Sequence, residues 1–191
     1  MQLASVFLAA LVPSVALAAT AYTPPASLAA AAKDPGNDCS LPVSYHVLNF
    51  VGKKNSSATD LSSYSFKYRN TNSNLTTECA WDTTSKSTTP DSLTPRFACA
   101  DRNVKFIWQG EQKRLTLIER VCPNTRGVPS YEVSGSADIP LHCGGTGACA
   151  SNQTDTLALF TSINPVRDPT HRRSNVVRNK KTRGVAWSFG A

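Results

Sequence analysis

The sequence lacks any apolar run long enough to cross a membrane, which takes about 20 residues. The one candidate is N-terminal, in MQLASVFLAALVPSVALA, where Pro13 and Ser14 interrupt the run. The small residues Ala16 and Ala18 suit signal peptidase, so we predict a signal peptide at 1–18 and not an anchor. We therefore expect a secreted, extracellular protein without a membrane span.

Catalytic motifs are also missing, since neither G-x-S-x-G nor H-E-x-x-H occurs. A hydrolase needs a base, an acid and a charge-stabilising group in one cleft. Two histidines, His46 and His142, fall where we expect the chain to fold. These histidines are candidate catalytic residues, and the other candidates are Glu119, Arg120, Glu132 and Asp138. Glu119 and Arg120 are adjacent on an expected strand and should face opposite ways. We predict no catalytic residue and keep a secreted hydrolase, most plausibly a ribonuclease, as the alternative.

Acidic residues are few, with 13 Asp and Glu against 20 Lys and Arg. Most of the excess lies in 167–191, where seven Lys and Arg stand against Asp168. We expect this basic tail to be disordered. Three explanations for it stay open: a tether to the cell wall or membrane surface, a segment removed by proteolysis during maturation, and a gene-model error. An extracellular chain rarely meets nucleic acid, so we expect no nucleic-acid partner. The Ala- and Pro-rich residues 19–38 are expected to be a flexible lead-in to one folded domain, 39–166.

Six cysteines behind a signal peptide favour three disulfides over zinc ligands or catalytic thiols, and 15 pairings are open. The segment CGGTGAC at 143–149 has three glycines that could suggest a phosphate loop. No Lys and no helix pattern follow it, so a turn closed by a disulfide is the better interpretation. We predict no metal and no cofactor.

Apolar and polar residues alternate along much of the expected domain, as in half-buried strands. Eight segments qualify, and QGEQK at 109–113 is typical of a hairpin turn between two of them. These segments are 43–51, 64–69, 75–81, 96–100, 103–108, 115–121, 131–139 and 156–163. The sequence predicts an all-β fold, an antiparallel β-barrel or sandwich of about 8–11 short strands, stapled by disulfides, with disordered termini.

Three sequons, which begin at Asn55, Asn74 and Asn152, are candidate N-glycosylation sites in a secreted chain. Asn74 is the least favourable, because it adjoins an expected strand.

The order of several landmarks resembles a known family. These are Cys39, YHVLNFVGKK at 45–54, SFKY at 65–68, Cys79, RFACADRNVKFIW at 96–108, LTLIERV at 115–121, YEVSGSADIPLHC at 131–143, Cys149 and INP at 163–165. Together they are similar to the AA1-like domain family, the Alternaria major allergen-like small secreted fungal proteins. The resemblance covers 39–165 and rests on order and spacing.

The resemblance implies a non-enzymatic allergen or effector-elicitor that binds a host (plant) defence protein, a host extracellular protein, or a small aromatic ligand. It also implies disulfides Cys79–Cys99 and Cys143–Cys149, with Cys39 free to link two subunits. Cys122 departs from the family pattern. A Cys39–Cys122 bridge would use both remaining cysteines, so we expect a monomer, with a disulfide-linked dimer through Cys39 as the alternative.

Overall fold

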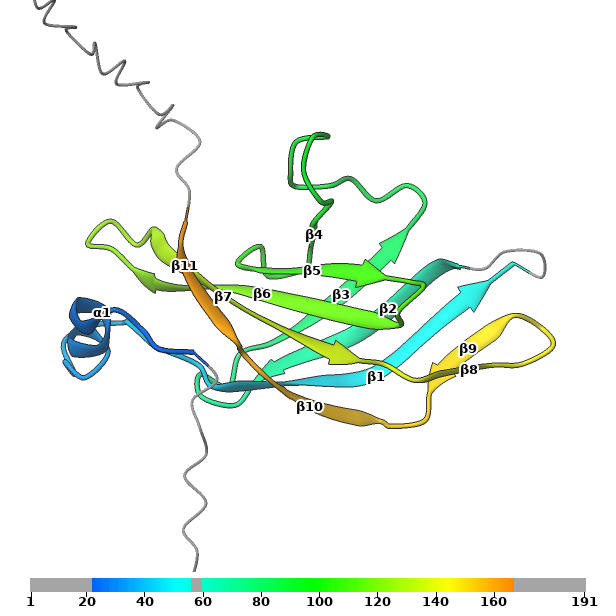
Figure 1. Ribbon diagram of the computed structural model, residues 1–191, viewed down its shortest axis with the longest axis horizontal. Coiled ribbons are helices and arrows are strands. Elements are labelled where there is room, and N and C mark those ends of the chain that lie inside the picture. The colour runs from blue at the N-terminus through cyan, green and yellow to red at the C-terminus, as the bar shows by residue number, and fades with distance from the viewer. Residues whose placement is uncertain (1–21, 56–59, 167–191) are drawn as a thin grey trace, which may run out of the picture.

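The computed structural model describes residues 22–55 and 60–166, which form two antiparallel β-sheets (Figure 1). The first sheet contains β1 (Ser44–Lys54), β2 (Leu61–Asn70), β3 (Thr76–Asp82), β8 (Leu141–Cys143), β9 (Ala148–Ser151) and β10 (Asp155–Leu159). The second contains β4 (Phe97–Ala98), β5 (Val104–Gln109), β6 (Arg114–Pro123), β7 (Pro129–Asp138) and β11 (Ser162–Pro165). The sheets do not close into a barrel. The fold is a β-sandwich, which confirms the all-β prediction.

Strand β1 is the centre of the first sheet, whose order is β3-β2-β1-β9-β8. Its first half pairs with β10 over Ser44–Leu48, and its second half pairs with β9 over Val51–Lys53. Between the halves, Asn49 has φ 52° and the register with β2 shifts, as expected at a β-bulge. Strand β1 therefore pairs with β10 and then with β9 along its length. The β8–β9 hairpin extends the sheet beyond the end of β10.

The second sheet has the order β11-β7-β6-β5-β4; the chain first enters it at β4 and returns to it by crossing from β10 to β11. Gly135 on β7 permits this crossing, because a Cβ there would lie 2.1 Å from the carbonyl oxygen of Leu159. At the other edge, the Cys79–Cys99 disulfide and a 2.8 Å bond from the Ala100 N–H to the Glu78 carbonyl join β3 to the β4 segment. The two sheets are thus connected to each other at both edges of the sandwich.

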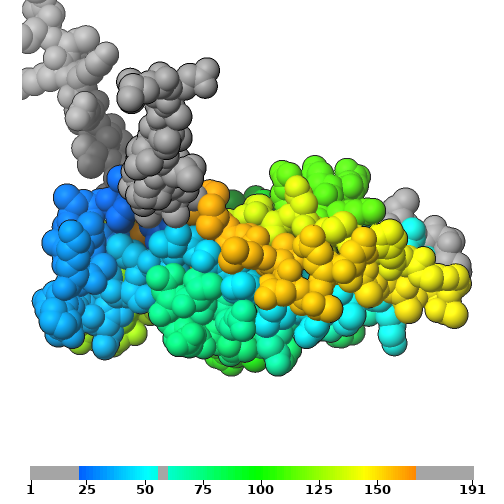
Figure 2. Space-filling model, turned by 90° about the horizontal axis from the view of Figure 1, so that it is seen from below, coloured from blue at the N-terminus to red at the C-terminus, as the bar shows by residue number. Residues whose placement is uncertain are grey.

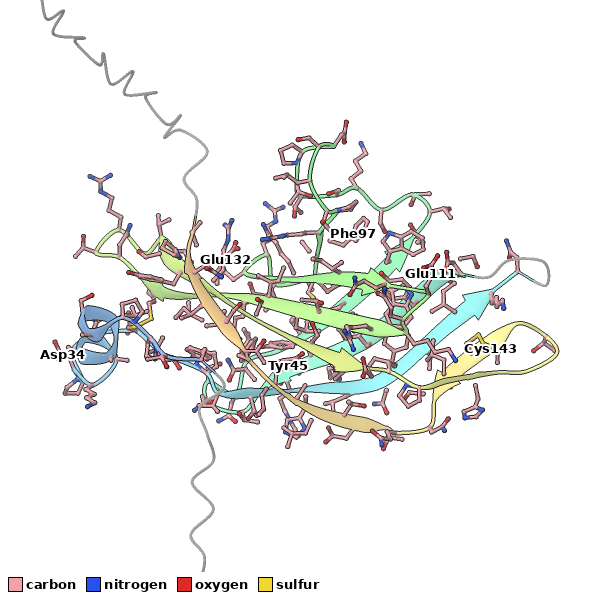
Figure 3. The ribbon with its side chains drawn as sticks, in the orientation of Figure 1. Asp34, Tyr45, Phe97, Glu111, Glu132 and Cys143 are labelled. Atoms are coloured by element: carbon pink, nitrogen blue, oxygen red, sulfur yellow. A yellow bond between two sulfur atoms is a disulfide. The ribbon has the colours of Figure 1, made fainter. Side chains whose placement is uncertain are left out.

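The space between the sheets is filled mainly by aromatic side chains. Tyr45, labelled in Figure 3, is fully buried there. Phe66 is stacked on Phe50 with ring centroids 5.6 Å apart and meets the edge of Phe106 at 5.3 Å. Such pairs combine a large buried apolar area with favourable ring geometry. Alternation in the sequence predicted the inward direction of Phe66 and Phe106, whereas Phe50 points inward because the bulge at Asn49 shifts the phase of β1.

Residues 22–38 differ from the flexible lead-in expected for 19–38. They contain helix α1 (Ala26–Ala31), with Leu28 buried in the core cluster. The Tyr22 hydroxyl donates to the Pro42 carbonyl at 2.7 Å. Alanine favours helix, and two apolar side chains suffice to anchor the segment. The expected signal peptide 1–18, residues 19–21 and the basic tail 167–191 lie outside the described residues.

All six cysteines are joined in disulfides, as Cys39–Cys122, Cys79–Cys99 and Cys143–Cys149. Asn55, Asn74 and Asn152 are exposed, and their glycosylation stays a prediction. Among the described residues, no helix is long and apolar enough to span a membrane. Helix α1 and the β8–β9 hairpin lie at opposite ends of the long axis of the sandwich (Figures 1 and 2).

Candidate functional site

The acidic groups considered for catalysis do not meet either histidine. Glu119 bonds to Tyr68 and Asn70, Glu132 to two arginines, and Asp138 to Arg114 at 2.9 Å. In residues 22–55 and 60–166, no group of three or more His, Cys, Asp or Glu is arranged to hold a metal. The acid–base set that a hydrolase requires is not assembled from these candidates.

Glu119 is buried in the core and hydrogen-bonded to two side chains of β2. Its Oε2 accepts hydrogen bonds from the Tyr68 hydroxyl and, at 2.7 Å, from the Asn70 amide. Burial raises the pKa of the Glu119 carboxyl, although both hydrogen bonds act in the opposite direction. Glu119, only 5% exposed as a residue, connects β6 to Tyr68 and Asn70 of β2 through this carboxyl.

His46 has an acidic partner that the sequence did not suggest. Its Nδ1 lies 2.6 Å from Asp155 Oδ1, and Arg69 Nη2 lies 3.7 Å from the other carboxylate oxygen. No Ser, Thr or Cys in the described part of the chain is hydrogen-bonded to this imidazole. The pair therefore lacks the nucleophile of a triad. His142 is exposed on β8.

A pocket lies at the end of the sandwich opposite α1, where three hairpins meet. Figure 3 shows Glu111 of the β5–β6 turn and Cys143 of β8 at this end. The cavity has a volume of about 130 Å³. We call it the end pocket. Its lining residues are Lys54, Asp60, Leu61, Trp108, Gly110, Lys113, Leu141 and Cys143.

Two glycines allow the hairpins to approach closely enough to form the end pocket. Gly147 in the β8–β9 turn has φ 79°, and a Cβ there would lie 2.2 Å from the Lys54 carbonyl oxygen. The Gly147 carbonyl also accepts a 2.8 Å hydrogen bond from the Lys54 N–H. A Cβ on Gly110 would lie 2.2 Å from Asp60 Oδ1. The segment CGGTGAC therefore positions one wall of the pocket.

Trp108, which lines the end pocket, carries a hydrogen-bond donor without a described partner. Its Nε1 is buried and has no partner in the described part of the chain. The nitrogen lies 3.5 Å from the position of a Gly110 Cβ, and Oδ1 of Asp60, which directly precedes β2, lies 2.2 Å from that same position. Leaving a buried donor unpaired costs about 1–3 kcal/mol, so such a group calls for an explanation. Within residues 22–55 and 60–166, the other buried side-chain nitrogen or oxygen atom without a partner is the Tyr45 hydroxyl oxygen, and Tyr45 does not line the pocket.

The polar groups around the end pocket carry charges of both signs. Lys54, Lys113 and Asp60 line it, and none of them forms an ion pair with another described residue. Leu61 and Leu141 add apolar wall. A few polar groups set in an apolar, partly aromatic wall are typical of small-molecule sites.

The end pocket was not predicted from the sequence. The hairpin turn at 109–113 and the disulfide-closed turn at 143–149 were both expected. Their convergence depends on the bulge in β1, after which the strand pairs with β9, and a bulge has no periodic signature. The sequence signal that was available is the glycine in each turn, Gly110 and Gly147. A glycine indicates that another segment can approach the backbone closely, but it does not identify that segment.

The fold is a disulfide-linked antiparallel β-sandwich. Two solved structures of the Alternaria alternata allergen Alt a 1 are similar to it. One is 17% identical and covers 64% of this chain and 88% of its own, with a TM-score of 0.45. The other is 15% identical and covers 65% and 95%, with a TM-score of 0.44. No family model matches the chain, and no curated protein matches it at a significant level. The sequence landmarks resemble the family of this same allergen.

Proposed function

We propose that the chain is a secreted, non-enzymatic fungal protein of the allergen or effector type, which acts by binding a small ligand in the end pocket. The observation that carries the proposal is a cavity whose wall includes Trp108, a residue with a buried indole N–H that has no described protein acceptor. The signal-peptide pattern and the order of the sequence landmarks support the secreted class. A host protein partner, which the sequence resemblance also implies, has no comparable feature in its favour.

The size of the cavity limits the ligand. A cavity of about 150 Å³ engineered in another protein accommodates benzene. The end pocket, at about 130 Å³, is slightly smaller, so we infer that it encloses at most a single ring. A ring with a carbonyl, hydroxyl or carboxylate oxygen could accept from the Trp108 N–H while it packs against Leu61 and Leu141. We expect a small aromatic compound with one oxygen acceptor.

The test is a nuclear magnetic resonance screen of single-ring aromatic compounds against the secreted protein. The indole resonance that disappears in Trp108→Phe identifies the Trp108 N–H, and a true ligand shifts that resonance saturably. Losing one hydrogen bond should weaken binding by about threefold to tenfold. The matched control is Trp81→Phe, because Trp81 packs on Tyr64 away from the end pocket and should leave the affinity unchanged.

Failure of the whole screen to shift the Trp108 resonance, or equal losses in the two variants, would contradict the proposal. The enzymatic alternative predicts turnover instead. Degradation of RNA by the purified protein, abolished by His142→Ala, would make the chain a ribonuclease.

A further inference from the structure

A row of charged side chains crosses the outer face of the second sheet. Arg96 directly precedes β4, Lys105 lies on β5, Arg120 on β6 and Glu132 on β7. Neighbouring strands therefore contribute one residue each. Arg120 and Glu132 are directly opposite in register, and their sequence neighbours Glu119 and Val133 are buried, so the pair points away from the core. We call these four residues the charged row.

The charged row contains more positive than negative charge. Glu132 is its one carboxylate, and both oxygens are engaged: Oε2 with Arg96 Nη1 at 2.9 Å and Oε1 with Arg120 Nε at 3.3 Å. Lys105 forms no ion pair with any described residue. Three cations therefore share one anion, which leaves an excess of two positive charges.

These groups are partly withdrawn from water. The side chains of Arg96 and Arg120 are about one-third exposed, and that of Glu132 is 18% exposed. Ile118, which pairs with Lys105 on the same face, is only 3% exposed, so this part of the face is covered. Burial, followed by the charge of Arg120, lowers the pKa of Lys105. Charges of one sign held close together and poorly screened create a demand for a counter-ion.

Hydrogen-bond donors are available to meet such a counter-ion. In the described part of the chain, Arg120 uses only Nε and Arg96 only Nη1 in side-chain hydrogen bonds, and Lys105 uses none of its three N–H groups. Guanidinium and ammonium groups match the oxygens of tetrahedral anions. We propose that the charged row binds an oxyanion of phosphate or sulfate type, free or as an ester, between Lys105 and the free N–H groups of Arg120.

This site is separate from the end pocket. None of the four residues of the charged row lines that cavity. An anion of charge −2 would balance the excess charge of the charged row. The proposed oxyanion site and the proposed ligand pocket can therefore fail or hold independently.

The test is titration of the full secreted protein with sodium sulfate, with sodium phosphate and with a sugar phosphate monoester. Backbone amide shifts are followed at Arg120 and Glu132, against sodium chloride at equal ionic strength. We expect saturable shifts with the oxyanions and not with chloride. Lys105→Met keeps the apolar stem and should weaken binding roughly tenfold or more, because hydrogen bonds to charged groups contribute about 1.5–3 kcal/mol.

The matched control is Lys67→Met, since Lys67 lies on the first sheet and is paired with Glu78 at 3.1 Å. It should bind as the native protein does. Thermal unfolding of both variants verifies that they fold, and Lys105→Met should be no less stable, because it removes a repelled charge. Tight binding of the ester but not of inorganic phosphate would make the ester the ligand. Equal shifts in chloride, the lack of saturation, or equal losses in the two lysine variants would overturn the proposal.

Discussion

Two buried polar groups, the Glu119 carboxyl and the Trp108 indole, have opposite environments. Glu119 accepts two hydrogen bonds within the core, whereas the Trp108 N–H has no partner in the described part of the chain. An unpaired buried carboxylate would cost far more than an unpaired N–H. The Glu119 contacts are therefore structural, and the Trp108 N–H is the donor that our proposal assigns to a ligand.

Replacement of Glu119 by glutamine should change how stability depends on pH. Burial raises the pKa of this carboxyl in the folded protein, so the folded state binds the proton more tightly than the unfolded state. Its contribution to stability is therefore complete at low pH and decreases as pH rises from the unfolded pKa, about 4.3, through the raised folded pKa. Glu119→Gln keeps an oxygen acceptor without the charge. Urea unfolding should show it more stable than the native protein at pH 7.

The stability difference between Glu119→Gln and the native protein should grow with pH above about 4.3. Glu111→Gln, at an exposed turn position, is the control and should leave stability nearly unchanged. A Glu119→Gln variant less stable than the native protein at pH 7 would show that the charge itself is required there.

Alternation along the strand predicted that Glu119 and Arg120 face opposite ways, and they do. Glu119 enters the core, and Arg120 joins the charged row on the outer face. The same alternation could not reveal that Trp108 lacks an acceptor. Alternation with a period of two residues shows to which face of the sheet a side chain points. It does not show which distant turn approaches a polar atom and supplies its hydrogen-bond partner.

At the scale of elements, seven of the eight expected strand segments correspond to single strands with shifted ends. The exception is 156–163, which the structure divides into β10 and β11. Each half hydrogen-bonds to a different sheet, because the chain crosses between the sheets near Phe160. Apolar periodicity continues through such a crossing, so it gives no sign that the partner strand has changed. The short strands β8 and β9 had no periodic signal of their own and were implied only by the turn between them.

In the β8–β9 hairpin, replacing one glycine by alanine should destabilise the protein, and replacing another should not. Gly147→Ala places a Cβ at φ 79° and 2.2 Å from the Lys54 carbonyl oxygen. The strained backbone and the clash should together lower the free energy of unfolding by about 2–3 kcal/mol. A Cβ on Gly145 would meet no neighbouring atom within 4 Å, so Gly145→Ala should change this free energy by less than about 0.5 kcal/mol. Urea unfolding measures both, and equal losses would contradict the role assigned to Gly147.

At the scale of the whole molecule, the disulfides close loops of very different length. Cys39 and Cys122 are 83 positions apart in sequence, and their bridge joins the segment after α1 to the end of β6, whereas Cys143 and Cys149 are six positions apart within one hairpin. A bridge restricts the unfolded chain more when the loop is longer. The first bridge therefore acts on global stability, and the second acts chiefly on the wall of the end pocket.

Removing each of these bridges should separate stability from ligand binding. In the loop-entropy model, Cys39→Ala with Cys122→Ala lowers the free energy of unfolding by about 4–5 kcal/mol, and Cys143→Ala with Cys149→Ala by about 2 kcal/mol. The first loss is a large part of the 5–15 kcal/mol typical of a domain. Ligand affinity at Trp108 should fall only in the second variant, because Cys143 lines the end pocket and Cys39 does not. Non-reducing urea unfolding and the Trp108 titration measure the two effects. Unchanged affinity in the variant without Cys143–Cys149 would mean that the hairpin holds its position without its disulfide.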